Sequence, residues 1–513
     1  YQPENRRIMP NGLLARRTIG YITEDTLANI VGIEGSFNSY LAGKDGMKVQ
    51  QRLTGGAWID VDNLETVHAR PGYNVVTTID LDLQDATENA LYKQLVKHKA
   101  HHGCAVVMEV KTGDIKAIAN LEIGSDGRYH ETYNYAVGES TEPGSTFKLM
   151  SMIAALEDGV IDLHDTINTG DGTVKYYDKV IRDHEEKGLG KITAREVFEH
   201  SSNVGTAKIV YESYKDNPRR YVDRLYSMQL NKPLGLQIKG EGKPVIRAPG
   251  DKLWSGISLP MMSHGYEVQM TPLQILTFYN AVANGGKMVK PRFVTEVRDG
   301  NRLVKSFGTE VITNAICSRS TIRKAQSLLE GVVESGTAKN LKNSNYKIAG
   351  KTGTAQIANL KHGYRSGSRI SYQASFVGYF PADDPLYSCI VVVNAPSNWV
   401  YYGNVVSGPV FKEIADKVYA GNFYRELQAL NPDAEEKVTL REASHEVETK
   451  DLTLAEGVMP NVVGMGLRDA MYMLENSGLR VNYSGRGKVV RQSPRPGVKI
   501  SRGATVAIEL RMK

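Results

Sequence analysis

Residues 143–148, with the sequence Pro-Gly-Ser-Thr-Phe-Lys, combine residue types that can carry out nucleophilic chemistry. A helix is predicted over residues 149–158, because apolar residues recur at near-helical spacing and Gly159 ends the pattern. Ser145 is therefore expected at or near a helix N-terminus, with Lys148 one turn further along the same face. A lysine whose pKa is lowered can remove the proton of a serine hydroxyl and make it a nucleophile. The same spacing also fits a helix cap followed by a solvated lysine, so both interpretations stay open on this motif alone.

Two more short motifs of polar residues lie further along the chain. Ser201-Ser202-Asn203 begins 56 residues after Ser145, and Lys351-Thr352-Gly353-Thr354 begins 206 residues after it. The first follows a helix predicted over residues 194–199, and the second lies on a predicted strand. Each could also be a cap, a surface turn or a strand end.

The elements that must position these motifs suggest an α+β fold. A hairpin is predicted from residues 104–110 and 115–119, and three late strands from residues 347–357, 374–380 and 386–393. The late strands follow one another through hairpins or short loops, which favours a central antiparallel sheet flanked by helices, with a large helical insertion between its early and late strands. A strand is predicted over residues 74–78. The other helices are predicted over residues 81–97 after the cap Asp80, 206–214, 218–228, from Thr271 to Asn284, 320–334, and 409–419 before Gly421. Residues 160–193 are predicted to be mainly loop.

The chain is expected to contain several domains. Residues 1–72 form a partial N-terminal domain, residues 73–425 the main domain, residues 426–457 a linker, and residues 458–513 a small αβ module. The linker is supported by a polar run, residues 433–456, with eight acidic and three basic residues, whereas the module carries ten basic and three acidic residues. Within the module, a helix over residues 467–476 and strands near residues 480–484, 489 and 506 are predicted.

Composition narrows the classes of function. The net charge is only +6, and no arginine-rich arm is present, so nucleic acid is not expected as a partner. Three cysteines fit neither a disulfide framework nor a metal site, and Cys104 and Cys389 read as core residues. A metal site at His98, His101 and His102 is conceivable but not predicted, because histidines at a helix C-terminus commonly answer the helix dipole. No cofactor or metal is therefore expected.

Taken together, the three motifs resemble those of one family, the class B penicillin-binding proteins, which are D,D-transpeptidases of bacterial cell-wall synthesis. The resemblance extends over nearly the whole chain. It includes residues 76–84 (VTTIDLDLQ), 107–117 (VMEVKTGDIKA), 265–266 (GY), 271–274 (TPLQ) and 378–381 (GYFP). Residues 459–465 (MPNVVGM) and 492–497 (QSPRPG) resemble one PASTA domain. This combination is similar to the division-type members, the FtsI and SpoVD-like branch.

The resemblance implies a role for each motif residue. Ser145 would attack the carbonyl between two terminal D-alanines of a peptidoglycan stem peptide, with Lys148 as the favoured base. Ser201 would relay a proton to the leaving D-alanine, and Asn203 would order Lys148 and the substrate amide.

The residues of the late strand would bind the substrate. Lys351 would lower the pKa of Lys148 and attract the substrate carboxylate, while Thr352 and Thr354 would hydrogen-bond it. Gly353 would let the backbone approach the substrate, and the N–H groups of Ser145 and Thr354 would form the oxyanion hole. The acyl group would then pass to an amine of a neighbouring strand.

The resemblance also implies partners and a location. β-Lactam antibiotics would acylate the enzyme, and an FtsW-type glycan polymerase and other divisome proteins would accompany it in septal wall synthesis. A single N-terminal anchor in the bacterial cytoplasmic membrane, with the catalytic domain on the extracytoplasmic side, is expected outside this chain. The chain starts at Tyr1 and enters the N-terminal domain midway, at residues 7–20, so we expect part of a longer protein. Glu267 stands where the family commonly has glycine, and no role is assigned to it.

Two rival functions use the same fold. A serine β-lactamase or β-lactam sensor is disfavoured, because no Glu-x-x-Leu-Asn motif of the class A lactamases is found and a PASTA tail would be unusual. A weakly catalytic scaffold that senses the wall or the divisome is disfavoured by the intact motif residues. The basic tail could bind anionic wall polymer or simply be a solvated face.

Overall fold

The computed structural model describes residues 8–21, 31–47, 49–61, 67–185, 187–357, 371–397, 400–430, 458–485, 487–501 and 503–511. The chain forms two compact units, Tyr1–Leu427 and Gln428–Lys513. The polar run of residues 433–456 lies outside the described ranges, and of the predicted linker, residues 426–457, only residues 426–430 are described, at the end of a helix. Within those ranges, no helix combines the length and the apolar character that crossing a lipid bilayer requires.

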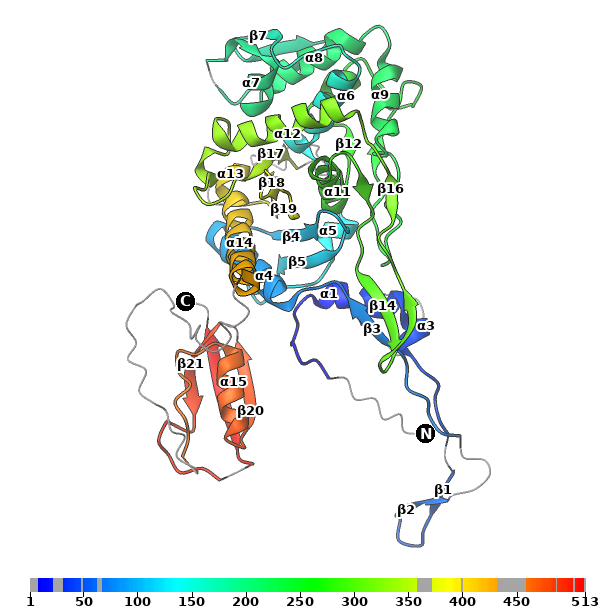
Figure 1. The fold of residues 1–513 in the computed structure, drawn as a ribbon, viewed down its shortest axis with the longest axis vertical. Helices are drawn as coiled ribbons and strands as arrows, with labels where there is room; N and C mark the ends of the chain where they lie inside the picture. Colours follow the sequence, from blue (N-terminus) through cyan, green and yellow to red (C-terminus); the bar gives the residue numbers. More distant parts are fainter. Residues whose placement is uncertain are drawn as a thin grey trace. The chain divides into compact units, whose positions relative to one another are not determined.

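A six-stranded sheet forms the centre of the first unit (Figure 1). Its order is β17-β18-β19-β4-β5-β6, and all neighbouring strands are antiparallel. The strands are β4 (His102–Glu109), β5 (Ile115–Ile123), β6 (Tyr129–His130), β17 (Ala349–Gln356), β18 (Tyr372–Phe380) and β19 (Tyr387–Asn394). The early hairpin β4–β5 and the late strands β17–β19 agree with the sequence prediction, and the α+β class is confirmed.

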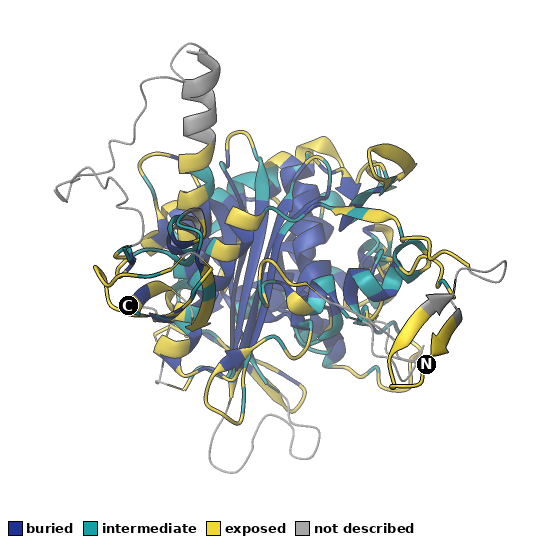
Figure 2. Ribbon diagram, turned by 90° about the horizontal axis from the view of Figure 1, so that it is seen from below, coloured by how far each residue is buried: buried dark blue, intermediate teal, exposed yellow. Residues whose placement is uncertain are grey.

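Helices cover the sheet, so its strands are buried along most of their length (Figure 2). This explains why β4 and β19 read as continuous apolar runs and not as alternating patterns. Helix α4 (Leu81–His98) packs on β4 and β5, while α11 (Pro272–Ala283) packs on β18 and β19. Both helices begin at the predicted residues: Asp80 accepts a hydrogen bond from Leu83 N, and Thr271 forms a capping box with Gln274.

The insertion between β6 and β17 is largely helical, and Figure 1 places α6 to α9 together at one end of the unit. Helix α6 (Lys148–Glu157) is buried from Lys148 to Leu156, as expected for a core helix that is apolar on every side. The other helices of this part are α5 (Tyr135–Gly138), the 3₁₀ helix η1 (Gly144–Phe147), α7 (Ala194–Glu199), α8 (Asn203–Tyr214), α9 (Pro218–Ser227), α10 (Ser258–Ser263), α12 (Arg319–Glu334) and the 3₁₀ helix η2 (Lys339–Leu341).

Two sequence expectations are corrected in this unit. The segment predicted as loop contains two antiparallel pairs, β7 (Thr166–Gly170) with β10 (Gly190–Thr193) and β8 (Thr173–Tyr176) with β9 (Lys179–Arg182). These strands are short, polar and partly exposed, so they lack the apolar periodicity that identifies buried strands. Helix α14 (Gly408–Leu430) continues through Gly421, because an interior glycine costs only about 1 kcal/mol of helix stability and does not prevent helix formation.

Smaller elements complete the first unit. Strands β3 (Asn74–Thr77), β14 (Val294–Asp299) and β15 (Arg302–Ser306) form a second sheet. Phe37 from the N-terminal region packs edge-on against Phe307, with ring centroids 5.6 Å apart. The remaining elements are α1 (Arg16–Ile19), α2 (Gly32–Ser36), α3 (Asn38–Leu41), β1 (Val49–Arg52), β2 (Trp58–Val61), β11 (Val245–Ile246), β12 (Val268–Gln269), β13 (Met288–Val289), β16 (Val311–Thr313) and α13 (Gly403–Val406).

The second unit has its own sheet and core. Strand β20 (Arg480–Gly485) is parallel to β22 (Thr505–Arg511), and β21 (Lys488–Ser493) is antiparallel to β22. Helix α15 (Leu467–Asn476) has the predicted bounds and packs on this sheet. Its core is formed by apolar side chains of all four elements, including Leu474, Val489, Val506 and Ile508.

Candidate active site

Ser145 lies in the tight turn η1, immediately before helix α6. Helix α6 begins at Lys148, one residue before the predicted start, so Ser145 lies near the helix N-terminus as expected. It sits in a 3₁₀ turn that begins at Gly144, whose φ is left-handed at 55°. Gly144 N donates to Gly265 O at 3.1 Å, and a side chain on Gly265 would come within 2.0 Å of Gly144 O. The Ser145 side chain is half-buried, and its hydroxyl makes no hydrogen bond with the part of the chain that the structure describes.

Lys148 is fully buried at the start of α6, one turn after Ser145. Its Nζ donates to Ser201 O at 2.5 Å, to Asn203 Oδ1 at 2.7 Å and to Ser201 Oγ at 3.2 Å. The lysine is therefore not the solvated residue that follows an ordinary helix cap. Its position is fixed by the Ser201 and Asn203 groups that the second motif contributes.

The second motif forms the connection between α7 and α8. A capping box of Thr193 and Glu196 starts α7, and the chain turns at Ser201, which has a left-handed φ of 57°. Ser202 then caps α8 by accepting a hydrogen bond from Gly205 N at 2.8 Å. As a result, Ser201 and Asn203 both reach Lys148 from one short turn.

The third motif lies on β17, at the edge of the central sheet. Lys351 is fully buried, and its Nζ donates to Ser201 Oγ at 2.8 Å and to Thr352 O at 3.2 Å. Thr352 Oγ1 lies 2.8 Å from Thr337 Oγ1. A side chain on Gly353 would meet Ser375 Oγ at 2.2 Å and Thr146 Cγ2 at 2.9 Å, so only glycine lets the strand approach the Ser145 turn this closely.

Burial governs the electrostatics of the two lysines. It lowers the pKa of Lys148 to about 7, even though the Asp183 carboxylate acts in the opposite direction. Burial and repulsion from Lys148 lower the pKa of Lys351 well below its usual value. A neutral lysine beside Ser145 is therefore available near neutral pH, and a second buried lysine lies on the other side of Ser201 Oγ.

The structure brings all three motifs into one site. Lys148, Ser201, Asn203 and Lys351 form one hydrogen-bonded cluster, while Ser145 lies one turn from Lys148 on the same segment. The Ser145 turn packs against β17, the strand that carries the residues predicted to bind substrate, Thr352, Gly353 and Thr354. Their predicted chemical roles remain to be tested.

The sequence analysis assigned no role to the segment of residues 264–267 beside this site, although residues 265–266 belong to the family resemblance. Glu267 has a left-handed φ of 57°; its N donates to Glu142 Oε1 at 2.9 Å, and its Oε2 accepts from the buried Ser258 Oγ at 2.6 Å. His264 is buried, and burial followed by the nearby Lys148 charge lowers its pKa to about 3. A neutral ring lets His264 Nδ1 donate to Pro260 O at 2.8 Å. The sequence signal in this segment is Glu267, which stands where the family that the sequence resembles commonly has glycine.

No metal-binding cluster of three or more His, Cys, Asp or Glu side chains occurs in the described ranges. Near the C-terminal end of α4, His101 Nδ1 lies 2.9 Å from His102 Nδ1, and His102 Nε2 lies 3.1 Å from Glu139 Oε2. The ring of His102 stacks on Tyr135, with centroids 3.9 Å apart. These histidines therefore contact neighbouring side chains.

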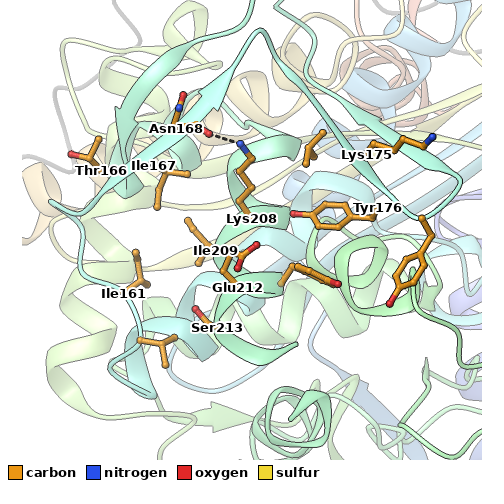
Figure 3. Close-up of a pocket in the computed structure, with 14 residues that line it drawn as sticks. Ile161, Thr166, Ile167, Asn168, Lys175, Tyr176, Lys208, Ile209, Glu212 and Ser213 are labelled. Carbon is orange, nitrogen blue, oxygen red and sulfur yellow. Dashed lines mark hydrogen bonds between the residues drawn. The ribbon is translucent and has the colours of Figure 1, made fainter. Parts of the chain in front are cut away.

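A separate groove of about 870 Å³ lies along α8 and the strands β7 and β8 (Figure 3). Tyr176 and Tyr211 line it, together with Lys208 and Glu212, and Lys208 Nζ donates to Asn168 O at 2.6 Å. None of the eight predicted site residues lines this groove. It is thus distinct from the cluster around Ser145.

Comparisons with known proteins place this geometry among characterised families. Residues 103–416 match the family described as penicillin binding protein transpeptidase domain, and residues 457–511 match the PASTA domain. The chain is 28% identical to peptidoglycan D,D-transpeptidase FtsI of Buchnera aphidicola over 438 residues, covering 84% of this chain and 71% of that protein. It is 26% identical to stage V sporulation protein D of Bacillus subtilis over 514 residues, covering 98% and 75%.

A solved structure shows the same fold. Penicillin binding protein 3 of Mycobacterium tuberculosis, complexed with aztreonam, superposes with a TM-score of 0.68 at 27% identity, covering 82% of this chain and 91% of that one. The similarity therefore extends beyond the motifs to the arrangement of the elements that carry them.

Proposed function

This chain belongs to the penicillin-binding protein transpeptidase family, as a division-type class B peptidoglycan D,D-transpeptidase with a PASTA domain, and from this premise we propose that Ser145 is its acylated nucleophile. The observation that carries the proposal is the cluster beside Ser145, in which Lys148 and Lys351 both donate to Ser201 Oγ. Such an arrangement supplies a neutral base, a proton relay and a positive charge within one site.

Acylation begins when Ser145 Oγ attacks the carbonyl carbon between the two terminal D-alanines of a stem peptide. Lys148 takes the hydroxyl proton, which its pKa of about 7 allows near neutral pH. The carbon–nitrogen bond then breaks, and the departing D-alanine amine receives a proton through Ser201. The product is an ester between the stem peptide and Ser145.

Strand β17 binds the donor peptide. As an edge strand, it can pair through its free backbone groups with an extended peptide. Lys351, Thr352 and Thr354 receive the terminal carboxylate, and the N–H groups of Ser145 and Thr354 stabilise the oxyanion. Loss of one such donor typically lowers turnover by about 100- to 1,000-fold.

An amine of a neighbouring strand completes the reaction. This amine of a neighbouring peptidoglycan strand attacks the ester carbonyl, a new amide bond forms as the bond to Ser145 Oγ breaks, and the proton lost by the amine returns to Ser145. β-Lactams acylate the same serine and block the cycle. From the resemblance to division-type members we also propose septal synthesis with an FtsW-type polymerase and divisome proteins. We propose an N-terminal anchor that holds the enzyme on the extracytoplasmic face of the membrane. The proposed domain bounds are those expected from the sequence: a partial N-terminal domain of residues 1–72, the transpeptidase domain of residues 73–425, a linker of residues 426–457 and the PASTA domain of residues 458–513.

Acylation by a fluorescent penicillin tests this proposal. Wild type is compared with Ser145→Ala by following the covalent adduct by intact mass over several hours. Ser140→Ala is the matched control, because Ser140 Oγ donates to Lys243 O and lies outside the cluster. We expect a long-lived adduct in wild type and Ser140→Ala and none in Ser145→Ala. Rapid release of hydrolysed drug would favour a β-lactamase, and absence of an adduct on folded wild type would favour a scaffold.

A further inference from the structure

Asp183 is an acidic residue that directly follows β9 and contacts the turn between α7 and α8. Its Oδ2 accepts a hydrogen bond from Ser202 Oγ at 2.8 Å, and its Oδ1 accepts one from Val204 N at 2.9 Å. The preceding residue contributes a third bond, because Arg182 O accepts from Asn203 Nδ2 at 2.8 Å. The end of β9 therefore binds three consecutive residues of the turn.

This turn needs such support, because Ser201 has the left-handed φ of 57°. That conformation is unfavourable for a residue with a side chain. Ser202 Oγ has a role on both sides of the turn: it donates to Asp183 and accepts from Gly205 N at the start of α8. Asp183 thus connects the strained turn to a hairpin and to the helix N-terminus at once.

The charge of Asp183 matters as much as its hydrogen bonds. Lys148 is faced by polar and charged groups from every surrounding element: Ser201 and Asn203 from the turn and α8, Lys351 from β17, Asp183 and His184 after β9, and His264 after α10.

Among these groups, the two histidines add no charge near neutral pH. Desolvation and the nearby Lys148 charge lower the pKa values of His184 and His264 below their usual value. Asp183 is therefore the negative group that acts on buried Lys148 in the described part of the site.

We propose that Asp183 is a positioning residue for acyl transfer, which binds Ser202 and Val204, directly after Ser201, through its two carboxylate oxygens and partly neutralises the positive charge of Lys148. This inference rests on the proposed role of Lys148 as the base. It assigns Asp183 no contact with substrate.

The two functions of Asp183 can be separated by two substitutions. Asp183→Asn keeps an oxygen that can accept a hydrogen bond but removes the charge, whereas Ser202→Ala removes one hydrogen bond and keeps the charge. The measurement is the rate of acylation by a fluorescent penicillin as a function of pH, with the melting temperature of each variant as a test of folding.

We expect Asp183→Asn to shift the acidic midpoint of this profile downward by about one pH unit, because an opposite charge nearby stabilises the protonated lysine. Ser202→Ala should keep the wild-type midpoint and lower the plateau rate several-fold. Asp183→Glu, which retains the charge but moves the oxygens, should behave like Ser202→Ala and serves if Asp183→Asn does not fold.

A wild-type midpoint in folded Asp183→Asn overturns the inference, whether or not its plateau falls. If Asp183→Asn does not fold, a shifted midpoint in Asp183→Glu overturns it. These outcomes are distinct from failure of the proposed function, in which wild type itself would form no Ser145 adduct.

Discussion

Replacement of Lys351 by glutamine should change the pH at which the enzyme becomes competent for acylation. Lys148 and Lys351 are both fully buried and both donate to Ser201 Oγ. Glutamine removes the positive charge but can still donate a hydrogen bond to that oxygen. Repulsion from Lys148 is one cause of the lowered pKa of Lys351, and this repulsion is mutual, so removing the Lys351 charge should raise the pKa of Lys148 wherever both lysines are protonated.

The distances in the site set the size of this change. Ser201 Oγ lies 3.2 Å from Lys148 Nζ and 2.8 Å from Lys351 Nζ, so the two nitrogens are at most about 6 Å apart. At this separation, two unit charges repel each other by about 3 kcal/mol at an effective dielectric constant of about 20. That energy corresponds to about two pKa units, so the acidic midpoint of acylation should rise by up to about two pH units. With the full rise, the neutral fraction of Lys148 at pH 7 would fall about 50-fold, and acylation should slow by up to the same factor.

The assay is stopped-flow acylation by a fluorescent penicillin, measured from about pH 5.5 to pH 10 at saturating drug. The midpoint of the acidic limb, and not the absolute rate, is the observable, because Lys351 also binds the drug carboxylate. Lys351→Arg retains the charge and is the control, with a midpoint close to that of wild type. If Lys351→Gln forms the adduct but keeps the wild-type midpoint, Lys351 carries no proton when Lys148 titrates, and the electrostatic reasoning fails.

Three further predictions concern stability. Glu267→Gly loses the hydrogen bond to buried Ser258 but relieves the left-handed backbone, so its free energy of unfolding should be about 1 kcal/mol below that of wild type. Glu267→Ala keeps the backbone strain, so its free energy of unfolding should be about 1 kcal/mol lower again. A Glu267→Ala variant more stable than Glu267→Gly would contradict backbone strain. Asp158→Asn should cost about 3 kcal/mol in urea unfolding, because Arg224 loses a buried carboxylate partner that is 3% exposed; an unchanged midpoint would refute this. Ile508→Ala should lower the free energy of unfolding of the second unit by about 2–4 kcal/mol, because Ile508 belongs to the core of that unit. The rate of acylation should stay unchanged, and a slower rate would show that the two units are coupled.

Local sequence signals predicted several of the elements that surround the site. Helix α11 was found from Thr271 and Gln274 because a capping box is a contact between near neighbours in the chain. Strands β4 and β19 were found because burial on both faces leaves continuous apolar runs. The position of Lys148 one turn after Ser145 likewise follows from helical spacing.

The assembly of the site did not follow from local patterns. No spacing rule brings Ser201 or Lys351 to Lys148, and the expectation that they meet came from resemblance to a family. The left-handed backbone of Ser201 and Glu267 was missed, because hydrogen bonds to distant residues hold it and the residue type does not favour it. Asp183 was missed for the same reason, since a single aspartate after a polar hairpin has no signature.

The order of strands in the central sheet also affects how the chain reaches its folded state. Strand β4 pairs with β19, and Val107 lies opposite Cys389, so the middle of the sheet joins segments that are made at very different times during synthesis. Contacts of such long sequence separation form slowly, because a large loop must close before they are gained. Until β19 arrives, the apolar β4–β5 hairpin has an open edge that can pair with other chains. We therefore expect chains truncated before residue 387 to aggregate, which light scattering during refolding would detect.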